Sequence, residues 1–125
     1  MRLRIATWNL HHQGCYYPMQ NNTVAFLSSL GAGVVVLTEF FPNKKHDAFF
    51  EALKEVGYVY RQMSLSVGGK NRTIIISRLP FTLGDIPPPE FQDAAASNFL
   101  HIHLNERHMD IIGLRMPCYK SVSAP

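Results

Sequence analysis

The architecture of this chain follows from two stretches, Arg4-Ile5-Ala6-Thr7-Trp8-Asn9-Leu10 and Val34-Val35-Val36-Leu37-Thr38-Glu39. Both are runs of residues that favour β-strands, and each ends in a side chain with an oxygen atom, Asn9 in the first and Glu39 in the second. The residues between them predict a helix, so the order is strand, crossover, strand. A crossover of this length permits parallel pairing, and such crossovers are right-handed almost without exception. We therefore expect the two strands to lie side by side.

Parallel pairing would bring the ends of both strands to the same edge of the sheet. Adjacent strands lie about 4.8 Å apart. An amide oxygen of Asn9 and a carboxylate of Glu39 can therefore reach one small ion with ligand distances of about 2.1 Å, and Mg²⁺ is the ion that prefers such ligands. Each residue also has an ordinary interpretation. An Asn after a strand is usually a turn residue, and a Glu after a buried strand usually meets solvent.

Composition places the chain among ordinary globular proteins. Its 125 residues are 46% hydrophobic and 17% charged, with a net charge of +3, and that length suffices for one domain with a real core. The positive charge eases the approach of a phosphate-rich partner but does not identify one. No apolar window is long enough for a transmembrane segment, and no signal-peptide pattern is present, so we expect a cytoplasmic protein. Cys15 and Cys118 form no disulfide framework, and we expect both to be reduced.

The rest of the chain predicts further strands and a second helix. Helical spacing with a closing glycine predicts helices that end at Gly31 and Gly57, the first burying Thr23, Phe26, Leu27 and Leu30. Extended segments follow at 58–63, 72–77, 98–104 and 108–114, and residues 81–86 are a candidate for a short edge strand. Six strands and two helices in this order predict an α+β fold, a layered β-sandwich with outer helices.

Three segments together carry a family resemblance. Thr7-Trp8-Asn9-Leu10, Val36-Leu37-Thr38-Glu39 and Arg72-Thr73-Ile74-Ile75-Ile76-Ser77-Arg78-Leu79-Pro80 resemble the N-terminal half of the endonuclease/exonuclease/phosphatase superfamily. The resemblance runs from the N-terminus to about Pro117. It implies that Asn9 and Glu39 hold a catalytic Mg²⁺ and that the substrate is a phosphodiester or phosphomonoester, including nucleic acid. We therefore expect residues 1–125 to form a single partial domain of this type.

The sequence departs from the family pattern in two places. Where the family often has a His at the end of a later strand, this chain has Arg115, which can clamp a phosphate but cannot take a proton. The family's general base lies in a Gly-Asp-Xaa-Asn segment further on, and the chain ends at Pro125 before such a segment. Gly84-Asp85 is a Gly-Asp pair, but it belongs to an early strand. The expected protein is a truncated hydrolase of the nuclease or phosphatase type, with weak or no turnover.

A non-catalytic interpretation stays open beside the enzymatic one. In it, the edge of the strand–helix–strand unit and Arg115 bind phosphorylated or nucleic-acid ligands. A chain with half of a sandwich would also leave sheet surface exposed, and a dimer would cover it.

Histidines supply two further candidates. His11 and His12 follow the first strand and could reach a phosphate or an ion, although histidines in a polar loop are more often solvated. His101 and His103 are two apart on a predicted strand, hence on one face, and with His108 they would form a Zn²⁺ site. Alternating polar positions on a half-exposed strand explain the same pattern without a metal.

Overall fold

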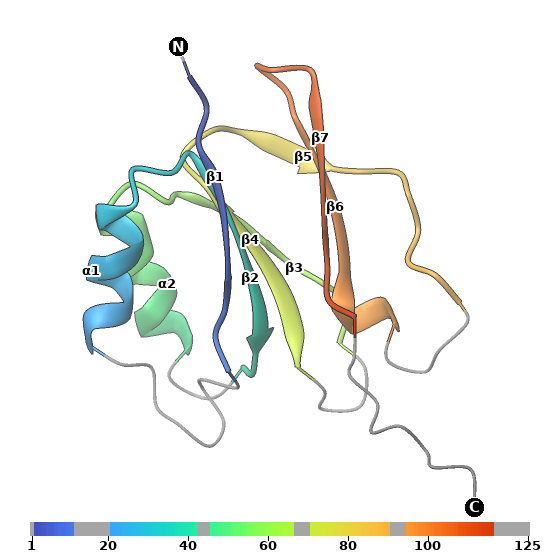
Figure 1. Ribbon diagram of the computed structural model, residues 1–125, viewed down its shortest axis with the longest axis horizontal. Coiled ribbons are helices and arrows are strands. Elements are labelled where there is room, and N and C mark those ends of the chain that lie inside the picture. The colour runs from blue at the N-terminus through green and yellow to red at the C-terminus, as the bar shows by residue number, and fades with distance from the viewer. Residues whose placement is uncertain (1, 12–20, 43–45, 67–70, 91–94, 117–125) are drawn as a thin grey trace, which may run out of the picture.

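Two β-sheets and two α-helices make up the described part of the chain (Figure 1). The computed structural model describes residues 2–11, 21–42, 46–66, 71–90 and 95–116. In chain order the elements are β1 (Ile5–Asn9), α1 (Asn21–Ser29), β2 (Val34–Phe40), α2 (His46–Glu55), β3 (Tyr60–Met63), β4 (Arg72–Ser77), β5 (Phe81–Leu83), the short 3-10 helix η1 (Ala95–Asn98), β6 (Phe99–Leu104) and β7 (Met109–Leu114). The predicted α+β class is confirmed. The candidate edge strand at 81–86 is confirmed as β5, although it ends at Leu83, so the structure describes seven strands where six were expected.

The first sheet has the strand order β1-β2-β4-β3. β1 and β2 pair in parallel, with Thr7 opposite Val36 and Asn9 opposite Thr38, which confirms the predicted strand, crossover, strand unit. All seven residues of β2 are buried, as expected for a central strand covered on both faces. Burial of each large aliphatic side chain there stabilises the fold by about 1.5–3 kcal/mol.

β1 lies at the edge of this sheet, and its two faces differ in burial. Ala6 and Trp8 pack against the core beneath the helices, whereas Ile5, on the opposite face, is 45% exposed. An edge strand has only one neighbour in its sheet, and the described residues leave Ile5 partly exposed to solvent.

Both helices pack on the same face of the first sheet (Figure 1). The inward face of α2 consists of Phe49, Phe50 and Leu53, which are buried. In α1, Thr23 and Leu27 are buried, but Phe26 is 48% exposed, and its ring contacts Trp8 in an edge-to-face arrangement. The expected burial of Phe26 is therefore wrong. Phe26 packs against Trp8 of β1, and among the described residues no strand continues the sheet beyond β1. Gly31 and Gly57 follow the helices with φ of 62° and 104°, the left-handed conformation that ends a helix cheaply.

The second sheet, β5-β6-β7, packs on the other face of the first. The shared core combines Val34, Val36 and Ile75 of the first sheet with Leu100, Ile102, Leu104 and Ile111 of the second. Gly113 permits this close approach, because a Cβ there would lie 2.8 Å from Cγ1 of Val36. The described layers are thus helices, first sheet and second sheet, with helices on one side only (Figure 1).

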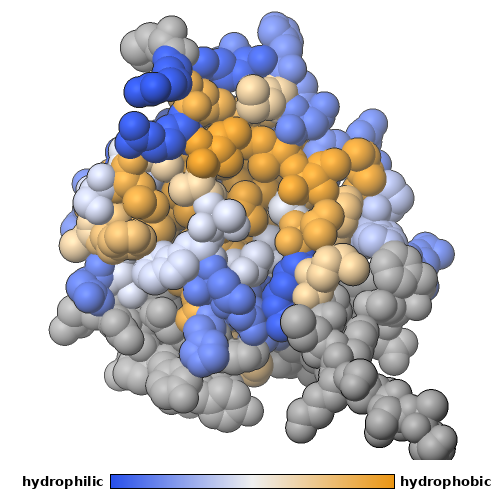
Figure 2. All heavy atoms as spheres, viewed as in Figure 1, coloured by the Kyte–Doolittle hydropathy of each residue, from blue (hydrophilic) through white to orange (hydrophobic). Residues whose placement is uncertain are grey.

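Apolar side chains reach the surface where the sheets end at β1 and β7 (Figure 2). The exposed apolar residues of these two strands are Ile5, Met109, Ile112 and Leu114. Neither α1 nor α2, the two α-helices among the described residues, is long and apolar enough to span a membrane. Cys15 and Cys118, expected to be reduced, lie outside the described residues.

Candidate metal and phosphate site

Asn9 and Glu39 lie at the same end of two adjacent strands. Asn9 is the register partner of Thr38, and Glu39 is the next residue along β2. One residue after Asn9, the backbone N–H of Leu10 donates to the carbonyl oxygen of Thr38 at 2.8 Å. The two strands are therefore hydrogen-bonded up to the end where Asn9 and Glu39 lie. The parallel pairing therefore brings together the two residues that the sequence selected.

The backbone of Glu39 departs from a regular strand. The pairing of β2 with β4 shifts register between Leu37 and Phe40, which is a β-bulge, and Glu39 has a φ of 56°. A residue other than glycine adopts this left-handed conformation at a cost of about 1–3 kcal/mol, and such residues cluster at functional sites.

The bulge turns the side chain of Glu39 to the other face of the sheet. Leu37 packs into the core under the helices, and in a regular strand Glu39, two residues on, would share that face. Instead its carboxylate contacts Arg115, which follows the last strand of the second sheet. Phe40, in turn, packs into the helix-side core. The bulge thus aims a buried acidic side chain towards the second sheet.

Arg115 connects the two sheets at this edge. Its Nη2 donates to Oε1 of Glu39 at 3.2 Å, and the exposed fractions of the two side chains are 26% and 8%. The backbone N–H of Arg115 donates to the carbonyl oxygen of Asn98 at 3.0 Å, which fixes the residue beside the start of β6. A guanidinium held in this way has further N–H groups that can donate to a second acceptor.

Asn9 is exposed, and its side chain makes a local turn. Its Oδ1 accepts a hydrogen bond from the backbone N–H of His11 at 2.8 Å, and His11 has a φ of 53°. This is the ordinary turn geometry of an Asn after a strand. It also orients the amide oxygen, which keeps a second lone pair for another partner. His12, the other histidine of this loop, lies outside the described residues.

The chemistry of these donors fits Mg²⁺ better than a softer metal. An amide oxygen and a carboxylate are hard ligands, and Mg²⁺ typically takes one or two carboxylates with water and phosphate oxygens as the remaining ligands. Within the part of the chain that the structure describes, no group of three His, Cys, Asp or Glu side chains is placed to hold a metal ion. A Mg²⁺ ion held by Asn9 and Glu39 would therefore take most of its ligands from water or from the phosphate of a substrate.

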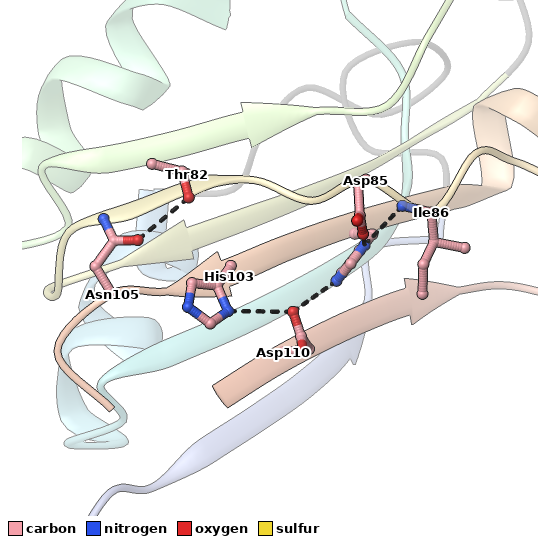
Figure 3. A network of polar contacts seen from close by, with 7 residues as sticks. Thr82, Asp85, Ile86, His103, Asn105 and Asp110 are labelled. Carbon is pink, nitrogen blue, oxygen red and sulfur yellow. Dashed lines mark hydrogen bonds and ion pairs between the residues drawn. The ribbon is translucent and has the colours of Figure 1, made fainter. Parts of the chain in front are cut away.

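Two of the three histidines of the zinc interpretation, His101 and His103, lie in a separate polar cluster on the outer face of the second sheet. Figure 3 shows His103 and Asp110 in this cluster. Nε2 of His101 and Nδ1 of His103 lie 2.9 Å and 3.2 Å from the same oxygen of Asp110. The backbone N–H of Ile86 donates to Nδ1 of His101 at 3.1 Å, so the proton of a neutral His101 is on Nε2 and points to Asp110. The shared carboxylate accounts for the histidine pair without a metal.

The same cluster holds residues that the sequence did not single out. Hydrogen bonds from His101, and then from His103, lower the pKa of Asp110 below its ordinary value. Asp85, set aside as part of an unrelated Gly-Asp pair, lies 4.0 Å from Nδ1 of His101. His101 itself is buried, which its position on a half-exposed strand did not predict.

Comparison with known proteins gives no relative: no protein-family model, curated protein or solved structure matches the chain.

Proposed function

We propose that this chain is a Mg²⁺-dependent phosphoester hydrolase of the nuclease or phosphatase type. In this proposal its layered architecture is the N-terminal part of the endonuclease/exonuclease/phosphatase fold. Asn9 and Glu39 hold the ion, and Arg115 binds the phosphate group. The observation that supports it best is the bulge at Glu39, because a strained backbone and a reversed side chain bring a buried carboxylate to Arg115. This carboxylate belongs to the residue after Thr38, the register partner of Asn9.

Each residue has a chemical role that its position allows. When bound, Mg²⁺ supplies a Lewis acid that withdraws charge from a phosphate oxygen and from the leaving alkoxide. The carboxylate of Glu39 provides the negative charge that attracts the ion, and the amide oxygen of Asn9 provides a neutral second ligand. Arg115 donates to phosphate oxygens and balances their charge, but it cannot accept the proton of an attacking water.

A second candidate function is a non-catalytic module that binds phosphorylated ligands or nucleic acid. It is favoured by the chemistry of this same edge, where Asn9 and Arg115 can bind a phosphate but neither can activate water. The two candidates share the ligand-binding residues and differ in turnover.

The test combines metal binding with hydrolysis. Mg²⁺ is titrated calorimetrically into the wild-type chain, Asn9→Ala and Glu39→Gln, with Glu55→Gln on the exposed side of α2 as the matched control. We expect the two site variants to weaken Mg²⁺ binding by about tenfold or more, a difference of at least about 1.4 kcal/mol. We expect the control to bind as the wild type does.

The same four proteins, together with Arg115→Met, are then assayed with bis-p-nitrophenyl phosphate and with DNA. Mg²⁺-dependent hydrolysis that both site variants abolish supports the enzyme. Metal binding with no hydrolysis, together with DNA retention that depends on Arg115, supports the binding module. Hydrolysis that survives both Asn9→Ala and Glu39→Gln, or Mg²⁺ binding unchanged in both variants, contradicts the proposed site.

A further inference from the structure

A cavity of about 240 Å³ opens at the edge of the sandwich formed by β3 and the segment after β5. Its wall on the first sheet consists of residues 62–65, and its wall on the second sheet consists of residues 83–88 with the start of β6. None of Asn9, Glu39 and Arg115 lines it. The cavity is therefore a separate feature from the site of the proposed function.

Apolar side chains dominate the lining. Three of them, Leu65, Leu83 and Ile86, are large and 64%, 64% and 46% exposed, so they lie at the mouth of the cavity. Pro87, Pro88 and Phe99 extend the apolar wall. Apolar walls with a few polar groups are typical of pockets for small organic ligands.

Hydrogen bonds hold both walls in place. On the second sheet, the backbone N–H groups of Gly84 and Ile86 donate to the carbonyl oxygen and to Nδ1 of His101, at 2.8 Å and 3.1 Å. His101 is held in turn by Asp110 (Figure 3). On the first sheet, the hydroxyl of Ser64 donates to the carbonyl oxygen of Ser97 at 2.6 Å and accepts the N–H of Thr73 at 3.0 Å. Because these hydrogen bonds hold both walls within the fold, the cavity is formed without a ligand.

The lining carries negative charge. Among the lining residues that the structure describes, Asp85 is the one carboxylate, and none is a lysine or an arginine. The side chain of Asp85 is fully exposed to solvent. A ligand with a positive charge would therefore be favoured over a neutral one of the same shape, by about fivefold for a charge about 4 Å from Asp85 in water.

We propose that this cavity binds an organic amine whose apolar body is somewhat larger than a benzene ring. Its volume lies between that of a cavity that accepts benzene, about 150 Å³, and the pockets of about 300–1,000 Å³ that accept drug-sized ligands. The apolar body fills the space between Leu65, Leu83 and Phe99, and the ammonium group lies at the mouth beside Asp85. This binding activity is independent of metal and phosphate chemistry.

The experiment compares two probes that differ in charge. 3-Phenylpropylamine and 3-phenylpropan-1-ol are titrated into the full chain, and binding is followed by NMR shifts of the methyl groups of Leu65, Leu83 and Ile86. We expect both probes to shift these methyl groups and the amine to bind about fivefold more tightly.

Two variants test the assignment of residues. Asp85→Asn is expected to remove the preference for the amine, whereas Asp47→Asn, on α2, is expected to keep it. Ala96→Leu, which fills part of the cavity, is expected to weaken both probes. The proposal is overturned if neither probe shifts these methyl groups at millimolar concentration. It is also overturned if the alcohol binds as tightly as the amine, or if Asp85→Asn keeps the preference.

Discussion

Arg115 donates a hydrogen bond to Glu39 across 3.2 Å, although 76 positions separate the two residues in the sequence. The bond joins the end of the second sheet to the bulge of the first. It also means that the carboxylate proposed to hold Mg²⁺ already has a cationic neighbour. A metal ion and Arg115 therefore compete for the negative charge of Glu39.

This competition predicts the effect of removing the arginine. Arg115→Met should raise the affinity for Mg²⁺ by roughly threefold to tenfold, because a positive charge next to the ion is lost. The same variant should bind inorganic phosphate more weakly. Calorimetric titration measures both, and Arg61→Met, whose guanidinium lies over the Phe50 ring on the helix side, serves as the control. Weaker Mg²⁺ binding in Arg115→Met would show that the arginine supports the metal site instead.

The left-handed backbone at Glu39 predicts an unusual order of stability. Glu39→Ala and Glu39→Gly both delete the carboxylate, but only glycine adopts a φ of 56° without strain. The Gly variant should be more stable than the Ala variant by about 1 kcal/mol. In a regular strand the order is the reverse, because glycine costs about 0.5–1 kcal/mol relative to alanine. Urea unfolding of both variants gives the difference, with the same pair of substitutions at Thr7 in β1 as the control. An Ala variant that is the more stable would contradict the strained backbone.

The packing of the two sheets predicts the cost of a methyl group at Gly113. Gly113→Ala places a Cβ 2.8 Å from Cγ1 of Val36, so the sheets must separate or a side chain must move. We expect a loss of about 1–3 kcal/mol in the free energy of unfolding. Adding Val36→Ala should recover part of this loss, because it removes the obstructing methyl group. Two losses that simply add in the double variant would show that the residues do not touch.

The lowered pKa of Asp110 predicts how stability changes in acid. A carboxyl group whose pKa is lower in the folded state stabilises the fold above its ordinary pKa. That contribution is lost as the pH falls below 3.8 towards the folded-state value. The difference in unfolding free energy between wild type and Asp110→Asn should therefore shrink below this pH. Urea unfolding from pH 7 to pH 2 measures it, and Glu90→Gln is the exposed control. A difference that is constant with pH would mean that the two histidines do not stabilise the carboxylate.

The sequence predicted the parallel strand pair because that prediction needs only local information. Strand length, the length of the crossover and the side-chain period are all visible between residues 4 and 39. The direction of Glu39 needs more, because the bulge arises from how β2 pairs with β4, and Phe40 is opposite Arg72 in that pairing. A period of two would have placed Glu39 with Leu37, on the wrong face.

In the histidine cluster, too, the sequence predicted the local feature but not the one that depends on tertiary contacts. The sequence correctly predicted that His101 and His103 share a face, since both contact Asp110. It did not predict the burial of His101, which results from the segment that begins at Gly84 lying against the imidazole. A Cβ at Gly84 would lie 2.1 Å from Nδ1 of His101. A glycine before the Asp85-Ile86 pair was thus the available signal, and it was interpreted as an ordinary strand residue.

Trp8, the single tryptophan of the chain, is the residue immediately before Asn9. Its half-buried indole and the ring of Phe26 make an edge-to-face contact, with the ring centres 5.1 Å apart. Its fluorescence should therefore respond both to the docking of α1 and to a change at the neighbouring amide. The protein thus has an intrinsic optical probe, through which ion titrations and unfolding can be followed without any label.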